Sequence, residues 1–133
     1  MKILFISFLA LNILFAGNYV VVTSQNSPIT KLSKSAIKKI YLKKKLFYAN
    51  QKLLPINLLA QDKIRMVFES RVLGMQREDI NDYWIEQHYH GITPPITQKS
   101  YRSLSEFIKN VKGSIGYLSK RNVNKKMRVL YEF

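Results

Sequence analysis

Ser103-Leu-Ser-Glu-Phe-Ile-Lys-Asn-Val-Lys-Gly-Ser-Ile-Gly-Tyr-Leu118 is the part of the sequence that says most about the fold. Ser103 and Glu106 have the spacing of a capping box, which predicts a helix that begins here and ends at Gly113. The five residues 114–118 that follow predict a strand. A helix that returns directly into a strand is typical of a sheet with helices packed on it.

Strand and helix patterns alternate on the N-terminal side of this unit. Ser33 and Asp62 are expected N-caps, and Gly74 is an expected helix end. Pro55 favours an edge position or a strand start for its segment. The expected elements are strands over 19–23, 53–58, 114–118 and 127–133, and helices over 34–45, 63–73, 77–89 and 103–113. This order predicts an α/β fold, a small mixed sheet with packed helices.

The charge is strongly positive, with 22 Lys and Arg against 8 Asp and Glu and a net charge of +14. We therefore expect anionic partners, although solvated helix surface is an alternative role for part of this charge. Cysteine is absent from the sequence. Disulfides, thiolate metal sites and cysteine nucleophiles are therefore excluded.

Residues 1–16 have the pattern of a cleavable signal peptide, with Lys2, an apolar stretch over 3–15, and Ala16-Gly17 at the expected cut. A retained membrane anchor is the alternative, but the apolar stretch is shorter than the roughly 20 residues that a span needs. We expect residues 17–133 to form one domain in the periplasm. Phosphate, acidic polysaccharide, lipid headgroups and acidic protein surfaces are then the candidate anions, and no nucleic acid partner is expected.

A set of segments, in this order and spacing, resembles a known family. The sequence is similar to the periplasmic substrate-binding proteins of phosphate ABC transporters, in a short form. Full-length members have two lobes that close on the ligand, and the resemblance implies about one lobe of a type 2 periplasmic binding protein here. The segments that carry it are Leu32–Leu42, Leu54–Asn57, Ile64-Arg65 with Phe68, Leu73-Gly74, Tyr83-Trp84, Gly91 with Pro94-Pro95, and Gly113–Tyr117.

The resemblance also implies a ligand site. In the family, the loop between the middle strand and the next helix carries an arginine and small hydroxyl residues around the oxyanion. Arg65 matches that arginine, while Gln61, Asp62 and Lys63 replace the hydroxyl residues, and Lys43 stands where the family has a glycine. An Asp at a helix start takes the positive end of the helix dipole that an anion would use. The alternative is that Asp62 is an ordinary N-cap and Arg65 a surface cation.

Hydroxyl residues also follow the first predicted strand. Ser24, Ser27 and Thr30 lie where a binding protein of this type can present hydroxyls and backbone amides to a ligand. With Arg65 they are the candidate ligand-binding residues. An ordinary polar turn is the alternative for this loop.

The sequence offers little for catalysis. It has no nucleophile elbow, P-loop or dinucleotide fingerprint, so we expect no enzyme, no catalytic residue and no cofactor. His88 and His90 are two residues apart and point in different directions on a helix, so we expect no metal site. His88 is expected on the buried side of its helix with Trp84, or at the rim of that side. Glu78, Asp79 and Asp82 are interpreted as a solvated helix face.

Two functions follow. The first is a periplasmic solute-binding protein that binds phosphate or another small oxyanion, or acts as an accessory of an ABC transporter or an envelope sensor. The alternative is a basic interaction module that docks on an acidic protein, a polysaccharide or an anionic membrane surface. The lysines at 38–39 and 43–45, interleaved with Tyr41, Phe47 and Tyr48, carry that alternative.

Overall fold

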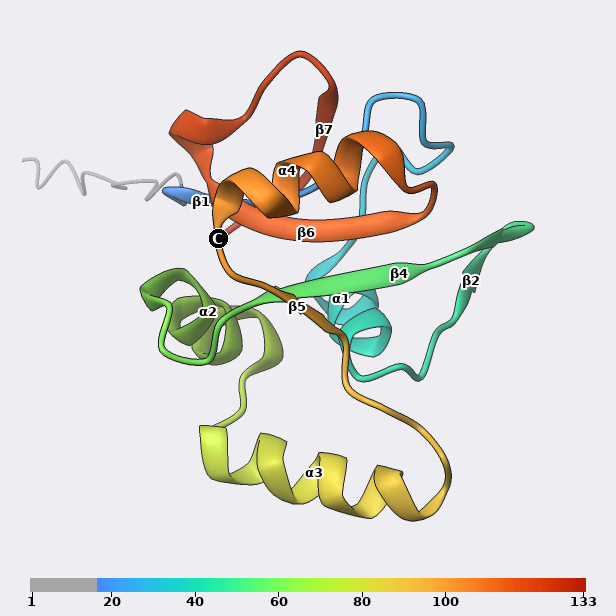
Figure 1. Cartoon of the computed structure of the whole chain (residues 1–133), viewed down its shortest axis with the longest axis vertical. Helices are drawn as coiled ribbons and strands as arrows, with labels where there is room; N and C mark the ends of the chain where they lie inside the picture. Colours follow the sequence, from blue (N-terminus) through green and yellow to red (C-terminus); the bar gives the residue numbers. More distant parts are fainter. Residues whose placement is uncertain (1–16) are drawn as a thin grey trace, which may run out of the picture.

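The computed structural model describes residues 17–133 (Figure 1). The predicted signal peptide, residues 1–16, lies outside the described residues. The fold is a five-stranded mixed sheet in the order β5-β4-β6-β1-β7, accompanied by a two-stranded hairpin, β2-β3. The predicted α/β class, a small mixed sheet with packed helices, is confirmed.

The chain runs through the elements in the order that follows. The strands are β1 (Tyr19–Ser24), β2 (Phe47–Tyr48), β3 (Gln51–Lys52), β4 (Leu54–Leu58), β5 (Ile96–Gln98), β6 (Ser114–Ser119) and β7 (Met127–Glu132). The α-helices are α1 (Lys34–Tyr41), α2 (Lys63–Phe68), α3 (Arg77–Tyr89) and α4 (Tyr101–Asn110). A π-helical turn, Glu69–Leu73, extends α2, and a 3₁₀ turn, Lys120–Asn122, follows β6.

Strand directions divide the sheet into two parts. β4 is parallel to both β5 and β6, whereas β1 is antiparallel to β6 and to β7. The carboxyl ends of β4, β5 and β6 therefore lie at one edge, with the start of β1. The end of β1 lies at the opposite edge, beside the starts of β4 and β6.

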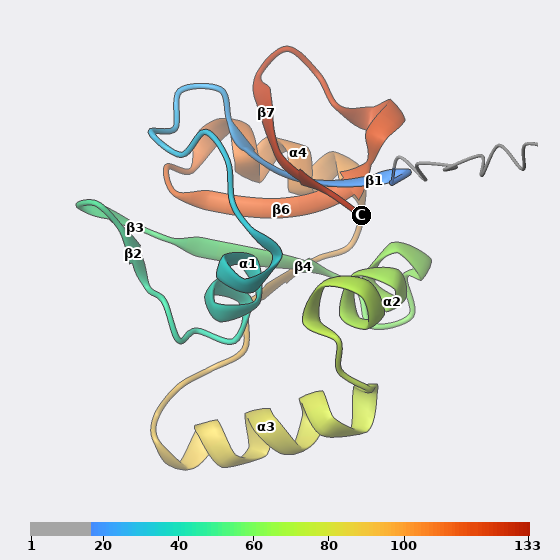
Figure 2. The ribbon, with the colours of Figure 1, turned by 180° about the vertical axis from the view of Figure 1, so that it is seen from behind.

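Helices cover both faces of the sheet. Alternate residues of a strand point to opposite faces, and β6 shows this clearly. Gly116 faces α4, where a Cβ would lie 2.9 Å from a methyl of Leu104, whereas Tyr117 stacks on Phe68 of α2 with ring centroids 4.1 Å apart. Figure 2 shows α1 and α2 on the face opposite α4. The result is three layers with β6 at the centre.

Buried aromatic rings fill the space between the sheet and the α1-α2 layer. Tyr41 contacts both Phe68 and Tyr117, and its hydroxyl donates to the carbonyls of Ile56 and Ile115. The Tyr117 hydroxyl donates to the Asn57 side chain and accepts from the Leu58 amide. Burial raises the pKa of both tyrosines. The core thus holds two phenols whose hydroxyl groups are satisfied.

The local signals predicted several boundaries correctly. Ser33 caps α1, Asp62 caps α2, and Gly74 ends the π-helical turn with φ of 61°. Pro55 lies at the start of β4, before the pairing with β5 begins, so the strand-start interpretation holds although β4 is an interior strand. The Pro55 nitrogen, which lacks a hydrogen, therefore needs no partner from β5.

Other expectations were wrong. The first helix ends at Tyr41 rather than 45, because Lys43 takes a left-handed φ of 57°. The capping box begins at Ser100, with Ser103 in the third helical position, since Ser103 returns a hydrogen bond that a glutamate was expected to make. His88 is exposed and lines the same groove as the half-buried Trp84, so of the two positions expected for it the rim is correct and the buried side is not. The hairpin β2-β3 and the strand β5 were not predicted, because two or three residues are too short to show an alternation.

α3 lies apart from the sheet, at one end of the molecule in both views (Figures 1 and 2). Ile80 is its buried residue, and the Tyr83 hydroxyl donates to the Leu42 carbonyl at 2.6 Å. Within the described residues, no helix is long and apolar enough to cross a membrane.

Candidate functional site

A pocket of about 390 Å³ lies at the sheet edge where β1 ends. The loop after β1 forms one wall with Ser24, Asn26 and Ser27, and the last turn of α4 with the following residues forms the other with Lys109 and Lys112. Gly113 ends the second wall in a left-handed turn and packs closely on β3, since a Cβ there would lie 2.0 Å from the Lys52 carbonyl. A side chain at position 113 would therefore disrupt this junction.

Two serine hydroxyls in this pocket are oriented by their own loop. The Ser24 hydroxyl accepts from the Asn26 amide at 3.3 Å, and the Ser27 hydroxyl accepts from the Ile29 amide at 3.1 Å. Within residues 17–133, neither hydroxyl donates a hydrogen bond to another protein group. Both O–H groups are therefore free to donate to a ligand oxygen.

Arg128 of β7 fixes the backbone of the same loop. Its guanidinium donates to the Ser27 carbonyl at 2.6 Å, the Ile29 carbonyl at 3.0 Å and the Gln25 carbonyl at 2.8 Å. The Gln25 amide also donates to the Lys126 carbonyl at 2.8 Å. This loop, residues 24–29, is called here the serine loop, and it is held in one conformation before any ligand arrives.

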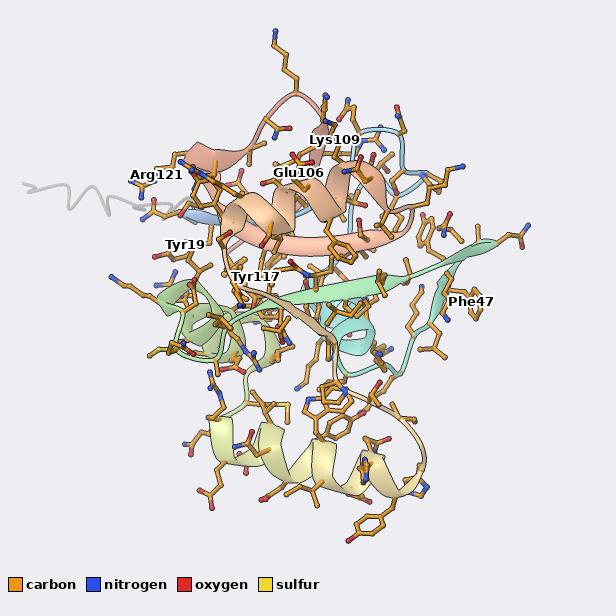
Figure 3. All side chains as sticks on the ribbon, in the orientation of Figure 1. Tyr19, Phe47, Glu106, Lys109, Tyr117 and Arg121 are labelled. Carbon is orange, nitrogen blue, oxygen red and sulfur yellow. The ribbon has the colours of Figure 1, made fainter. Side chains whose placement is uncertain are left out.

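Positive charge gathers around the pocket. Lys109 and Lys112 are among the lining residues, and none of the lining residues is Asp or Glu. The Lys109 side chain also lies close to that of Lys126, and this proximity lowers the pKa of Lys126. Lys109 and Glu106 lie one turn apart on α4 (Figure 3). These lysines offset Glu106 and the partial negative charge of the α4 carbonyl end, and favour an anionic ligand.

Arg65, the candidate that the family resemblance supplied, lies elsewhere. It follows the carboxyl end of β4, at the opposite edge of the sheet, roughly a strand length of 17 Å from the serine loop. Its guanidinium donates to Glu69 at 3.3 Å and to the Leu58 carbonyl at 2.9 Å. Arg65 is thus largely engaged within the protein.

Glu69 is the buried carboxylate that organises this second region. It lies between Arg65 and Arg77, and the Arg77 Nε contacts it at 2.8 Å. Arg77 also donates to the Ala60 carbonyl at 2.8 Å. This network ties the start of α3 to the loop after β4, and its role is to hold the structure together.

The start of α2 is also occupied. The Asp62 carboxylate accepts from the Ile64 amide at 2.8 Å, so it takes the place where an anion would approach the helix amides. Arg65 is paired with Glu69 as well, so both the helix amides and the guanidinium that the resemblance implied for an anion at residues 60–65 are already engaged within the protein.

The four predicted site residues therefore do not form one site. Ser24 and Ser27 line the same pocket, Thr30 is exposed and outside the lining residues, and Arg65 lies at the opposite edge. The sequence reasoning missed Lys109, Lys112 and Arg128. Lys109 and Lys112 are three residues apart at the end of a predicted helix, so their shared position could have been predicted from the sequence. The contact of Arg128 with a loop about 100 residues away in the chain could not.

Histidines and carboxylates do not gather into a metal site. Among residues 17–133, no group of three or more His, Cys, Asp or Glu side chains is placed to hold an ion. The arrangement offers binding groups, mainly hydroxyl and ammonium donors, rather than a nucleophile beside a base.

Comparison with protein-family models finds no match, and comparison with curated proteins finds none either. Solved structures do match. An ABC-type phosphate transport receptor from Vibrio cholerae aligns with a TM-score of 0.69 and 18% identity over 86% of this chain and 45% of its own. A phosphate ABC transporter substrate-binding protein from Clostridium perfringens, solved with bound phosphate, aligns with a TM-score of 0.71 and 15% identity over 86% and 44%.

The fold is that of one part of a phosphate-transporter substrate-binding protein. PstS from Borrelia burgdorferi adds a third match, with a TM-score of 0.65 and 16% identity over 86% of this chain and 46% of its own. The predicted resemblance, a single-lobe form of this fold, is confirmed. The chain spans less than half the length of each of these structures. At such identities the likeness concerns the fold, and the ligand has to be argued from the residues of this chain.

Proposed function

We propose that this protein binds a small oxyanion of the phosphate class in the pocket between the serine loop and the end of α4. It acts outside the cytoplasm as the binding or accessory component of an ABC transporter or an envelope sensor, without catalysis. The observation that carries the proposal is the pocket itself. Two oriented hydroxyl donors and two lysines line it, and no lining residue is Asp or Glu.

The chemistry of this donor set fits an oxyanion. Hydrogen bonds from hydroxyls to charged oxygens are short and strong, and ammonium groups add attraction that does not depend on ligand orientation. The loop is already fixed by Arg128, so little ordering is needed on binding. The fold of the phosphate-transporter neighbours supports the same ligand class, and phosphate is bound in one of them.

Titration calorimetry of the purified protein tests this proposal. We expect saturable heat with phosphate or sulfate at millimolar concentration or below, in a buffer of physiological ionic strength. Ser24→Ala with Ser27→Ala, and separately Lys109→Met with Lys112→Met, should each weaken binding at least about tenfold. Lys34→Met with Lys39→Met on α1 removes the same charge away from the pocket and is the control.

Two results would count against the pocket. The first is the absence of saturable heat with every oxyanion tested. The second is equal weakening by the α1 control, which would mean that only net charge matters.

The location is tested separately. Native mass spectrometry of the protein purified from its own cell envelope should give the mass of a chain that begins at Gly17, with any bound anion retained. An unprocessed chain recovered from the cytosol would remove the periplasmic assignment.

A second candidate function is the docking of a basic surface, and one observation favours it. Lys43, Lys44 and Lys45 precede two apolar side chains, Leu46 and Phe47, that are about half exposed. Exposed apolar groups next to lysines favour an acidic partner surface with an apolar part. Reversal of these three charges should abolish partner retention in a pull-down, and unchanged retention would exclude this function.

A further inference from the structure

α3 presents an apolar groove that the protein itself does not fill. The groove has a volume of about 880 Å³ and is lined mainly by α3, with Trp84, Ile85 and Tyr89 among its residues and Pro94 at its end. Ile85 is 61% exposed and Tyr89 84% exposed. These two side chains are four residues apart and share one face of the helix. Such large apolar side chains grouped on a surface favour contact with another molecule.

The same helix carries concentrated negative charge. Glu78, Asp79, Asp82 and Glu86 are all exposed, and they are half of the eight acidic residues of the whole chain. Glu78, Asp82 and Glu86 are four residues apart, so they form a stripe along the helix. The expected partner surface is therefore basic as well as apolar.

A surface of that kind exists on the protein itself. Residues 43–52, called here the basic hairpin, contain four lysines and no acidic residue. Leu46 is 47% exposed and Phe47 is 54% exposed. Phe47 lies at the outer side of β2, away from the sheet (Figure 3). The basic hairpin thus offers positive charge and exposed apolar side chains, which complement the acidic stripe and the apolar groove of α3.

The basic hairpin and α3 are neighbours within one molecule. The Tyr83 hydroxyl donates to the Leu42 carbonyl at 2.6 Å, and the Lys44 ammonium lies 5.9 Å from the centre of the Tyr83 ring. Because the two complementary surfaces lie side by side, a two-fold axis can place the basic hairpin of one copy against α3 of the other, and α3 of the first against the hairpin of the second. The contact is then made twice and the assembly closes as a dimer.

We propose that the chain forms a two-fold dimer in which the basic hairpin of each copy docks on α3 of the other, with Phe47 in the α3 groove. This dimer is separate from oxyanion binding. It rests on the proposed docking function, because it identifies α3 of a second copy as the acidic surface on which the basic hairpin docks. Each copy has a high net positive charge, but charges farther apart than about 8 Å are screened at physiological salt. Local complementarity therefore outweighs the overall repulsion.

A charge-swap experiment on the full chain tests the dimer. One variant carries Lys44→Glu and Lys45→Glu, and the other carries Asp82→Lys and Glu86→Lys. In a homodimer of either variant, like charges meet at both contacts, so each should be monomeric in sedimentation velocity. Mixed in equal amounts, the variants should form a heterodimer, since one contact is wild type and the other is reversed but complementary.

Two further variants sharpen the experiment. Phe47→Ala keeps every charge and should weaken the wild-type dimer at least about tenfold, because it removes the apolar group that fills the groove. Lys34→Glu with Lys39→Glu makes the same charge change on α1 and should leave the dimer intact. Circular dichroism of each variant shows whether it is folded.

Two outcomes would overturn the proposal: a wild-type protein that is monomeric at every concentration tested, or folded charge-swap variants that do not associate when mixed. If the wild type is monomeric but binds phosphatidylglycerol vesicles through Lys44 and Lys45, the dimer is wrong and the docking function stands with lipid as its surface. If the hairpin charges affect neither association nor vesicle binding, both fail.

Discussion

Replacement of Glu69 by glutamine should destabilise the protein strongly. The carboxylate is buried, with 6% of its side chain exposed, and it lies between Arg65 at 16% exposure and Arg77 at 36%. Glutamine keeps the size of the side chain but removes the charge, and one end of its amide cannot accept hydrogen bonds. Two guanidinium groups then lose the charge that compensates them.

The expected size of the effect follows from these exposures. Removal of one partner from a fully buried ion pair costs about 3–5 kcal/mol. Both arginines keep contact with water and with the backbone carbonyls of Leu58 and Ala60, which lowers the cost to about 2–3 kcal/mol. With a urea dependence of about 1.5 kcal/mol per molar, the unfolding midpoint should fall by roughly 1.3–2 M.

Equilibrium unfolding in urea, followed by circular dichroism, measures this midpoint. Glu106→Gln is the matched control, because Glu106 is exposed and its hydrogen bond is with the neighbouring Asn110 side chain at 3.3 Å. The control should change stability by less than about 0.5 kcal/mol. A Glu69→Gln midpoint equal to that of the control would refute the idea that this network holds α3 to the loop after β4.

Three other changes test different parts of the structure. Lys43→Gly should raise the free energy of unfolding by about 1 kcal/mol, because φ is 57° there and because burial and the nearby Lys52 charge lower the pKa of the Lys43 amine; a melting temperature that does not rise would contradict this. Burial raises the pKa of Tyr41 and Tyr117 in the folded state, so above about pH 10 only the unfolded chain loses these protons. Stability should then be insensitive to these groups below pH 10 and fall above it by up to about 2.7 kcal/mol per pH unit, and Tyr117→Phe should roughly halve that slope in urea titrations at each pH. Arg128→Gln should speed hydrogen exchange of the amides in the serine loop and weaken oxyanion binding while β6 stays protected; unchanged exchange would show that the three carbonyl contacts do not order the loop.

The sequence alone determined several helix boundaries and the fold class. Ser33, Asp62 and Gly74 predicted helix boundaries because caps depend on residues three or four positions away. The pattern of strand and helix signals predicted an α/β fold with a small mixed sheet. The family-like segments predicted that this fold resembles one lobe of a phosphate-transporter substrate-binding protein. The helix boundaries rest on contacts between near neighbours in the chain, and the resemblance rests on the order and spacing of the segments.

Only the tertiary structure decided which residues share a site. The antiparallel pairing of β1 with β6 places Ser24 and Ser27 at the edge opposite Arg65, and brings them to Lys109 and Lys112. Arg65 pairs with Glu69 four residues later, which is a local contact that the sequence spacing could have indicated, and only the approach of Arg77 to the same carboxylate is a tertiary contact. The reason is physical: strand order and direction are set by packing of the whole core, and no local pattern encodes them.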